Sequence, residues 1–259
     1  MKPDEIRGPI TRIPSAPLDQ GSGFGYSRGS EPMMKRFLIL SLVFPTLWLT
    51  PLRADDEIRP GLVEHLVAQT ENLRSEVLEL AFGAYADGLE EGLFGRERLT
   101  VIDYSLPSYE ERLWVIDMKT MTVLYEEIVA HGMGSPRGSG GDMESAKDFS
   151  NLHGSKKSSL GLFVTAETYH GGHGFTLRLD GLEEGVNDNA RERLIVIHGA
   201  HYVTEDRADD HLVGRSWGCP VVRPEISREI IDAIKDGSAL WIYYPDDGWL
   251  EESEFLDED

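Results

Sequence analysis

The feature that most constrains the fold is a series of short runs rich in β-branched and aromatic residues between residues 99 and 244. Each run is followed by a loop rich in Gly, Ser or Asn, which is the pattern of strands joined by turns. The runs are residues 99–104, 112–117, 123–129, 161–165, 175–179, 194–198 and 239–244. With one helix expected over residues 224–236, the sequence predicts a mainly β domain, a sandwich or barrel that carries one or two helices.

A helical segment is predicted in front of this domain. Within residues 60–93 apolar residues recur at spacings near three, four and seven, which is typical of an amphipathic helix. These residues are Leu62, Leu66, Leu73, Val77, Leu80 and Leu89. We expect a helical preface at 55–95 that packs on a main domain at 96–245, followed by an acidic tail at 246–259.

Residues 33–54 have the layout of a signal peptide. Lys35 and Arg36 precede an apolar run, and the small residue Ala54 is followed at once by an acidic segment, as a cleavage site requires. The apolar run is well short of the roughly 20 residues that span a bilayer as a helix. A buried core helix is the alternative interpretation of this segment.

The position of this segment bears on the start of the chain. A signal peptide belongs at the N-terminus, yet residues 1–32 are polar and rich in Gly, Pro and Ser. We expect translation to start at Met33 or Met34, so that 1–54 is a dispensable extension plus the signal peptide. The mature chain would begin near Asp55, would have no membrane span, and would be exported to the periplasm or cell envelope.

The predicted mature chain is strongly acidic. From residue 55 onward it has 18 Lys and Arg against 42 Asp and Glu. Binding to nucleic acid and to anionic lipid depends largely on Lys and Arg contacts with phosphates. The sequence therefore predicts no nucleic acid partner.

The chain has a single cysteine, Cys219, which in an exported protein cannot form an internal disulfide. It stands between Gly218 and Pro220, where the backbone can turn tightly. Consecutive backbone N–H groups there can point at one spot, as stabilisation of a developing oxyanion requires. A buried and inert thiol is the alternative interpretation.

A cysteine nucleophile needs a nearby base, because a thiol with a pKa of about 8.5 is mostly protonated at neutral pH. His198 is the best candidate. It ends the apolar run of residues 194–197 and should stand at the mouth of a buried strand. A histidine that only caps a strand is the alternative.

The two residues lie in a pattern that resembles a known family. Ile197-His198-Gly199-Ala200 is followed, after 17 residues between His198 and Ser216, by Ser216-Trp217-Gly218-Cys219. This resembles the YkuD-like L,D-transpeptidase signature of a His, a similar spacer and then Ser/Thr-His-Gly-Cys. Residues 99–245 are similar to the variant Ser-Trp-Gly-Cys-Pro group of murein L,D-transpeptidase catalytic domain proteins. Its other marks are Val129–Gly132, Phe149–Asn151, Ser158–Gly161, Tyr169 with Gly171–Gly174, Leu179–Leu182 and Asn187–Ala190.

Two positions depart from the main family. Trp217 stands where the family has a His, so that imidazole is absent while a backbone N–H remains. The family's arginine two residues beyond the cysteine is replaced by Val221, and the nearest arginine is Arg223.

The resemblance implies a YkuD-like β-sandwich or barrel that acts on peptidoglycan stem peptides through a thioester. An acceptor amine would make the enzyme a transpeptidase, and water would make it a carboxypeptidase. Cys219 would be the nucleophile and His198 the base. The backbone N–H groups of Trp217, Gly218 and Cys219 would stabilise the oxyanion. The resemblance implies no cofactor.

Further roles are expected for five residues around this pair. Gly199, or a nearby carbonyl, would orient His198, and Ser216 would give polar support. Tyr169 and His173 would line the cleft, and Arg223 is a candidate for binding a substrate carboxylate.

Three other functions compete with this interpretation. The pairs His170/His173 and His198/His201 suggest a zinc hydrolase, but residues three apart on a strand face opposite sides, and His-Glu-x-x-His is absent, so we expect no metal. A non-catalytic wall-binding module would suit the acidic surface and the missing motif histidine, although it has no need of a free thiol. The third alternative is a cysteine peptidase of other specificity.

Overall fold

A computed structural model describes residues 61–135 and 143–256, so the expected signal peptide and N-terminal extension lie outside the described residues. The strands form one eight-stranded sheet in the order β3-β2-β1-β8-β4-β5-β6-β7. The strands are β1 Arg98–Asp103, β2 Glu111–Asp117, β3 Thr122–Ile128, β4 Gly161–Gly171, β5 Gly174–Gly181, β6 Val196–Gly199, β7 Val221–Val222 and β8 Ala239–Tyr243. The predicted mainly β fold is confirmed.

The centre of the sheet is covered on both faces. In β8 all five residues are buried, and in β1 only Arg98 is partly exposed. Strands buried on both faces read as continuous apolar runs, which is why the runs at 99–104 and 239–244 show little polar alternation. β1 and β8 are parallel neighbours, as are β6 and β7, while the other pairs are antiparallel.

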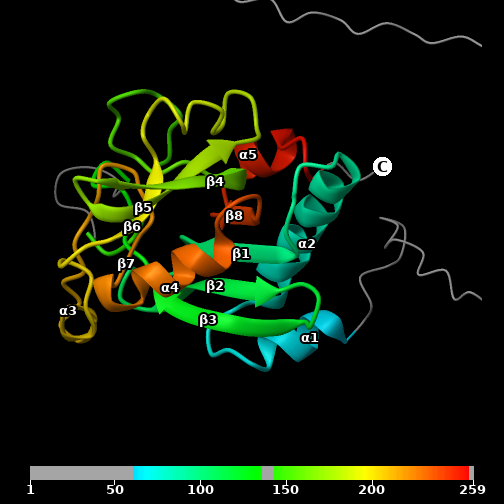
Figure 1. Ribbon diagram of the computed structural model, residues 1–259, viewed down its shortest axis with the longest axis horizontal. Coiled ribbons are helices and arrows are strands. Elements are labelled where there is room, and N and C mark those ends of the chain that lie inside the picture. Colours follow the sequence, from blue (N-terminus) through cyan, green and yellow to red (C-terminus); the bar gives the residue numbers. More distant parts are fainter. Residues whose placement is uncertain (1–60, 136–142, 257–259) are drawn as a thin grey trace, which may run out of the picture. The chain divides into compact units, whose positions relative to one another are not determined.

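Helices cover this centre from different sides (Figure 1). α4, Pro224–Ile234, contacts β6, β5 and β1 and buries Ile230, Ile231 and Ile234. α2, Ser75–Glu90, contacts β1 and β8, and α1, Leu62–Val67, contacts α2. The buried side chains of α1 and α2 belong to the same hydrophobic core as the sheet. The helical preface is therefore two helices that share the core of the main domain.

Three elements are absent from the sequence-based expectation: β7, α3 at Glu205–Asp209, and α5 at Asp247–Glu252. α5 lies within the stretch expected to be an acidic tail. It packs because Trp249 is buried, with its ring centroid 5.2 Å from that of Trp241. One large apolar side chain outweighs the solvation of its acidic neighbours.

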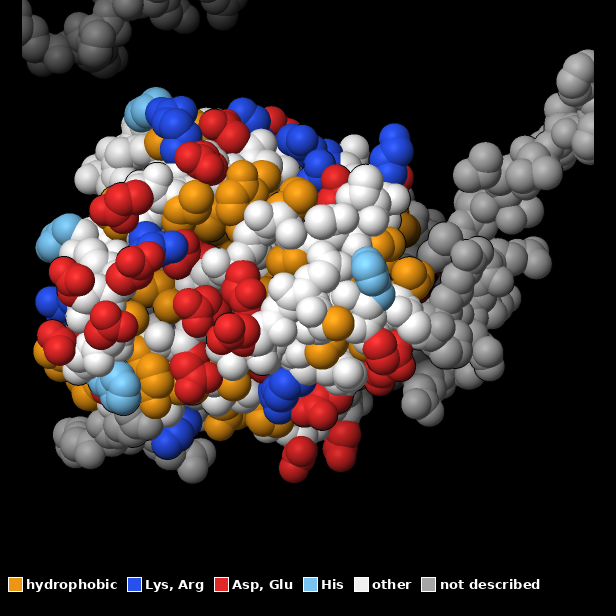
Figure 2. All heavy atoms as spheres, turned by 90° about the horizontal axis from the view of Figure 1, so that it is seen from below, with side chains coloured by type: hydrophobic (Ala, Val, Ile, Leu, Met, Phe, Trp, Pro, Cys, Tyr) orange, Lys and Arg blue, Asp and Glu red, His pale blue; other side chains and the backbone are white. Residues whose placement is uncertain are grey.

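The surface keeps the acidic character of the sequence. Figure 2 shows Asp and Glu side chains spread over the face that is seen from below, with apolar side chains between them. Among the described residues, the helices are all too short or too polar to cross a membrane.

Candidate functional site

Cys219 ends a tight turn that begins at Ser216. The Ser216 hydroxyl accepts a hydrogen bond from the Gly218 N–H at 3.0 Å and donates one to the Cys219 carbonyl at 2.7 Å. The turn is also joined to the chain that follows β3, because the Ser216 N–H donates to the His131 carbonyl at 2.9 Å. The buried Ser216 thus fixes, through these hydrogen bonds, the backbone that carries the thiol.

Gly218 is required by the shape of this turn. Its φ is +124°, a conformation that L side chains rarely adopt. A Cβ at this position would lie 2.7 Å from the Lys157 carbonyl oxygen and 2.8 Å from the Ile195 Cδ1. The Gly218 carbonyl also accepts a hydrogen bond from the Ser158 hydroxyl at 3.2 Å. The turn therefore rests directly on the backbone of residues 157 and 158.

His198 lies on β6 and pairs with Val221 of β7 in parallel register. Directly paired residues project to the same face, and residues two apart on one strand also share a face. Cys219 stands two residues before Val221, and its thiol is hydrogen-bonded by the Val196 N–H, so it lies beside the start of β6. A contact agrees with this placement, since the Cys219 Sγ lies 3.6 Å from the carbonyl oxygen of Leu194, just before β6.

The orientation of the His198 ring is set by its own strand. Its Nδ1 lies 3.1 Å from the Gly199 carbonyl oxygen, which can only accept, so Nδ1 carries the proton and Nε2 is the nitrogen able to take one. The ring stacks on His173, with centroids 4.2 Å apart and planes inclined by 21°. Burial lowers the pKa of His198, the Gly199 carbonyl raises it, and His173 lowers it further.

The resting pair is therefore neutral. Burial raises the pKa of the Cys219 thiol, and the Val196 N–H and the Arg193 guanidinium only partly oppose this effect. Because the pKa of His198 is lowered and that of Cys219 raised, both the imidazole and the thiol are neutral near pH 7. An ion pair of imidazolium and thiolate is disfavoured before a substrate arrives.

The three expected oxyanion donors differ in their bonding. The Gly218 N–H is engaged by the Ser216 hydroxyl. Among the described residues no acceptor is found for the Trp217 N–H, while the Cys219 N–H interacts with its own thiol and lowers the thiol pKa. The indole of Trp217 is 70% exposed, and the Lys156 ammonium lies 4.7 Å from its ring centroid.

Tyr169 lies in the same cross-strand row as His198. Tyr169 pairs with Thr176, and Thr176 pairs with His198, so the three share one face of the sheet. The Arg178 guanidinium stacks on the Tyr169 ring at 4.4 Å from its centroid. Tyr169 and His173 thus come to the face that carries His198, His173 by direct stacking.

Arg223 is placed differently from the expectation that it binds a substrate carboxylate. Its Nε and Nη2 donate to the two carboxylate oxygens of Glu127, each at 2.8 Å, and Nη1 is paired with Glu205. Two carboxylates of the chain already hold this guanidinium. A substrate carboxylate would have to displace them.

Sequence reasoning missed a buried cationic group next to the turn. The Arg112 side chain is fully buried and donates to the carbonyls of Val129 and Leu106, with distances from 2.6 to 3.0 Å. Its Nη2 also donates to the His131 Nδ1 at 3.0 Å, and its guanidinium lies 4.9 Å from the Tyr104 ring centroid. Burial, then Arg112 and Arg215, lower the pKa of His131 to about 2. The only signal was His131 within the family mark Val129–Gly132.

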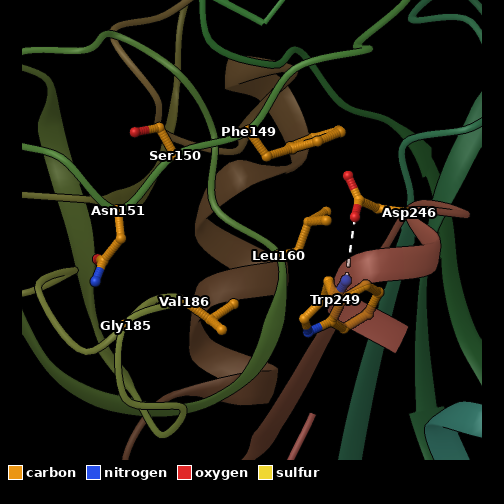
Figure 3. A pocket seen from close by; sticks show the side chains of 8 residues that line it. All are labelled: Phe149, Ser150, Asn151, Leu160, Gly185, Val186, Asp246 and Trp249. Carbon is orange, nitrogen blue, oxygen red and sulfur yellow. Dashed lines mark hydrogen bonds between the residues drawn. The ribbon is translucent and has the colours of Figure 1, made fainter. Parts of the chain in front are cut away.

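A cavity of about 180 Å³ lies elsewhere in the domain. Figure 3 shows the Leu160, Val186 and Trp249 side chains turned toward one another, with the Asp246 carboxylate accepting the Trp249 N–H. Its lining includes neither Cys219 nor His198. Within residues 61–135 and 143–256, no cluster of three His, Cys, Asp or Glu side chains could hold a metal ion.

Comparison with known proteins identifies the family of the chain. Residues 69–243 match the model of the L,D-transpeptidase catalytic domain family, so the chain belongs to that family. The variant Ser-Trp-Gly-Cys-Pro grouping stays a prediction. No curated protein matches the chain.

Solved structures to which the chain is similar include L,D-transpeptidases. An L,D-transpeptidase from Mycobacterium smegmatis is 13% identical with a TM-score of 0.35, and the match covers 58% of this chain and 60% of that one. L,D-transpeptidase 1 from Mycobacterium tuberculosis is 13% identical with a TM-score of 0.32, covering 58% and 63%. An L,D-transpeptidase from Xylanimonas cellulosilytica is 14% identical with a TM-score of 0.33, covering 61% and 68%. The match spans about 60% of the length of the first two.

Proposed function

We propose that this chain is an exported cysteine enzyme that acts on peptidoglycan stem peptides through a thioester on Cys219. Membership of the L,D-transpeptidase family supports the reaction class. The observation that supports the proposal is the β6–β7 register, which pairs His198 with Val221, two residues from Cys219. The bond from His198 Nδ1 to the Gly199 carbonyl adds to it, because it leaves Nε2 as the proton acceptor.

The reaction follows from these two side chains. As the Cys219 Sγ attacks the carbonyl of the donor stem, its proton passes to the His198 Nε2 and a C–S bond forms. When the tetrahedral intermediate collapses, the C–N bond breaks and His198 returns the proton to the leaving amine of D-alanine. The thioester is then attacked by an acceptor amine, whose proton passes to His198 before the released thiolate recovers it.

The neutral resting pair fits this order of events. His198 with a lowered pKa is unprotonated and ready to act as the base, so the thiolate need form only as the C–S bond forms. The N–H groups of Trp217 and Cys219 are the proposed oxyanion donors, since that of Gly218 already has an acceptor. Tyr169 and His173 are proposed to border the stem peptide.

Mass analysis of muropeptides tests the proposal. The mature protein is incubated with disaccharide tetrapeptides, with Cys219→Ala as the control. We expect loss of D-alanine and a crosslinked dimer, both absent in the control. A tripeptide alone would mean carboxypeptidase activity, because the same thioester would then be resolved by water.

Two alternatives are separated by the same assay. A non-catalytic wall-binding module predicts that peptidoglycan is retained by the protein while no mass changes and no adduct forms on Cys219. A cysteine peptidase of other specificity predicts cleavage of peptides outside the L,D-configured stem. The family membership, together with the position of Cys219 two residues from the strand partner of His198, favours the transpeptidase.

Export is proposed from the sequence of residues 33–54 together with the wall substrate of the reaction class. Cleavage after Ala54 would leave the helical preface and the catalytic domain at 96–245 in the periplasm or cell envelope. N-terminal sequencing of the protein from the envelope fraction tests this. A start near Asp55 is expected, and a chain that retains residues 33–54 in the cytoplasm would contradict it.

A further inference from the structure

Arg193 is a half-buried arginine whose hydrogen bonds all go to neutral acceptors. Its Nη1 donates to the Ser150 carbonyl at 2.6 Å and to the Ser159 hydroxyl at 2.5 Å. Its Nη2 donates to the Lys157 carbonyl at 2.7 Å and to the Ser155 hydroxyl at 3.2 Å. Among the described residues no carboxylate forms an ion pair with it. Its positive charge is therefore not cancelled locally.

The chain has 46 Asp and Glu against 25 Lys and Arg, and Arg193 shares with Arg112 a bonding to neutral acceptors. Arg191, two residues earlier, is paired with Asp180 and Glu167. Arg223 is paired with Glu127 and Glu205. In the described part of the chain the Arg193 guanidinium has no carboxylate partner, although acidic residues are in excess. Four neutral oxygens fix its position.

Arg193 is connected to the Ser216–Cys219 turn in two ways, through its side chain and through its backbone. The Lys157 carbonyl that accepts its Nη2 lies against Gly218, where an added Cβ would be 2.7 Å from that oxygen. The residue after Arg193 is Leu194, and its carbonyl oxygen lies 3.6 Å from the Cys219 Sγ. The Lys157 carbonyl thus lies between the Arg193 guanidinium and the turn. The Leu194 carbonyl lies between the Arg193 backbone and the thiol.

The chemistry of the thiol calls for such a charge. Forming a thiolate in a partly buried position is costly, and a fixed cation reduces that cost. His198 is a poor source of positive charge because its pKa is lowered. The other titratable groups that interact with the thiol are Tyr104, after β1, and Tyr202, after β6, and both stay neutral because burial raises their pKa to about 12.

We propose that Arg193 is a positioning residue that holds the loop under Gly218 and supplies the fixed positive charge for the Cys219 thiolate. His198 moves the proton, and Arg193 stabilises the charge that remains. The same guanidinium thus does the electrostatic work that an imidazolium does in an ion-paired cysteine site. The inference rests on the proposed function only in taking Cys219 as the nucleophile.

The test is the rate of alkylation of the full chain by iodoacetamide across a range of pH. Cys219 is the only cysteine, so the rate reports on this thiol alone. In Arg193→Gln we expect the apparent pKa of the thiol to rise by about one unit, because removing a positive charge that interacts with the thiol disfavours the thiolate. Arg193→Lys should restore most of the difference. Arg191→Gln is the matched control and should leave the profile unchanged.

A folded Arg193→Gln protein with an unchanged profile would overturn the inference, as would a Lys variant shifted as far as the Gln variant. Thermal unfolding establishes folding. If the Gln variant does not fold, the Lys variant is the deciding test, because it keeps the charge and loses the four hydrogen bonds of the guanidinium. An unchanged alkylation profile of the Lys variant supports the inference. A shift of about one pKa unit overturns it.

Alkylation needs no substrate, so its outcome is separable from the proposed function. A shifted profile in Arg193→Gln, together with muropeptides that the wild type leaves unchanged, would overturn the stem-peptide function and leave the role of Arg193 standing. An unchanged profile with active wild-type enzyme would do the reverse.

Discussion

Two buried polar clusters of the domain differ in how completely their polar atoms are hydrogen-bonded. In the Glu183 cluster, one carboxylate oxygen accepts from the Leu162 N–H at 2.6 Å, and the other accepts from the Trp249 indole and the Ser253 hydroxyl, both at 2.9 Å. The His131 cluster is formed by Arg112, His131 and Tyr104. There the His131 Nε2 is buried and has no partner among the described residues.

The two clusters lie at different places, one beside the candidate site and one away from it. A buried group left without a partner costs about 1 to 3 kcal/mol, so the His131 cluster is not arranged for greatest stability. It adjoins the Ser216–Cys219 turn, whose first N–H donates to the His131 carbonyl. The Glu183 cluster instead joins α5 to the start of β4. We therefore expect changes in the Glu183 cluster to affect stability alone, and changes at the turn to affect the thiol as well.

The largest effect is expected for Glu183→Ala. The substitution leaves three buried donors without an acceptor, and we expect the free energy of unfolding to fall by about 3 to 5 kcal/mol. Urea unfolding measures it, with the exposed neighbour Glu184→Ala as control. The pH profile of Cys219 alkylation in the folded fraction should not move. A shifted profile would contradict the expectation that the Glu183 cluster affects stability alone.

Next is Gly218→Ala. The φ of +124° and the close Lys157 carbonyl make any side chain costly, by about 2 to 3 kcal/mol. Because the turn must move, the rate of Cys219 alkylation should change along with stability. Gly172→Ala, where a Cβ would meet nothing within 4 Å, is the control and should be nearly neutral. Equal effects of the two substitutions would refute a special role for the turn.

His131 should make stability depend on pH. Its pKa in the folded chain is about 2, so below the ordinary histidine value only the unfolded chain binds this proton. Stability is then complete above about pH 6.5 and falls as the pH drops, by about 2 kcal/mol at about pH 5. His131→Gln keeps an acceptor for Arg112 and cannot titrate. The difference in unfolding free energy between the two proteins should shrink or reverse on acidification, and a constant difference would contradict this.

The smallest effect is expected for Ser253→Ala. It removes one of the three donors to Glu183 and leaves the carboxylate with the other two, so the loss should be about 1 kcal/mol. Thermal unfolding is precise enough to detect it. A loss as large as that of Glu183→Ala would mean that the hydroxyl, and not the carboxylate, organises the cluster.

The sequence predicted the parts of this molecule that depend on local pattern. Seven of the eight strands appeared as apolar runs, and α4 as a single helix, because burial on a regular period leaves a readable trace. The two-residue β7 is too short to leave one. α5 was hidden because its acidic residues outnumber the one side chain, Trp249, that anchors it.

Site residues could be predicted only where the residue type itself indicates a chemical role. Cys219 and His198 stood out as a lone thiol and a histidine at a strand end, within a family signature. Arg112 and Arg193 did not, because nothing in a sequence distinguishes an arginine bound to carbonyls from one paired with a carboxylate. Arg223 illustrates the reverse case, since its proximity in sequence to Cys219 concealed its pairing with Glu127.

The most direct test of the proposed mechanism is detection of the covalent intermediate on Cys219. Wild-type protein is quenched in acid during reaction with tetrapeptide muropeptides, and its intact mass is measured and mapped by peptide digestion. The account predicts an acyl adduct that has lost D-alanine, on the peptide that contains Cys219, and none on Cys219→Ala. Product formed without any adduct, or an adduct at another residue, would contradict it.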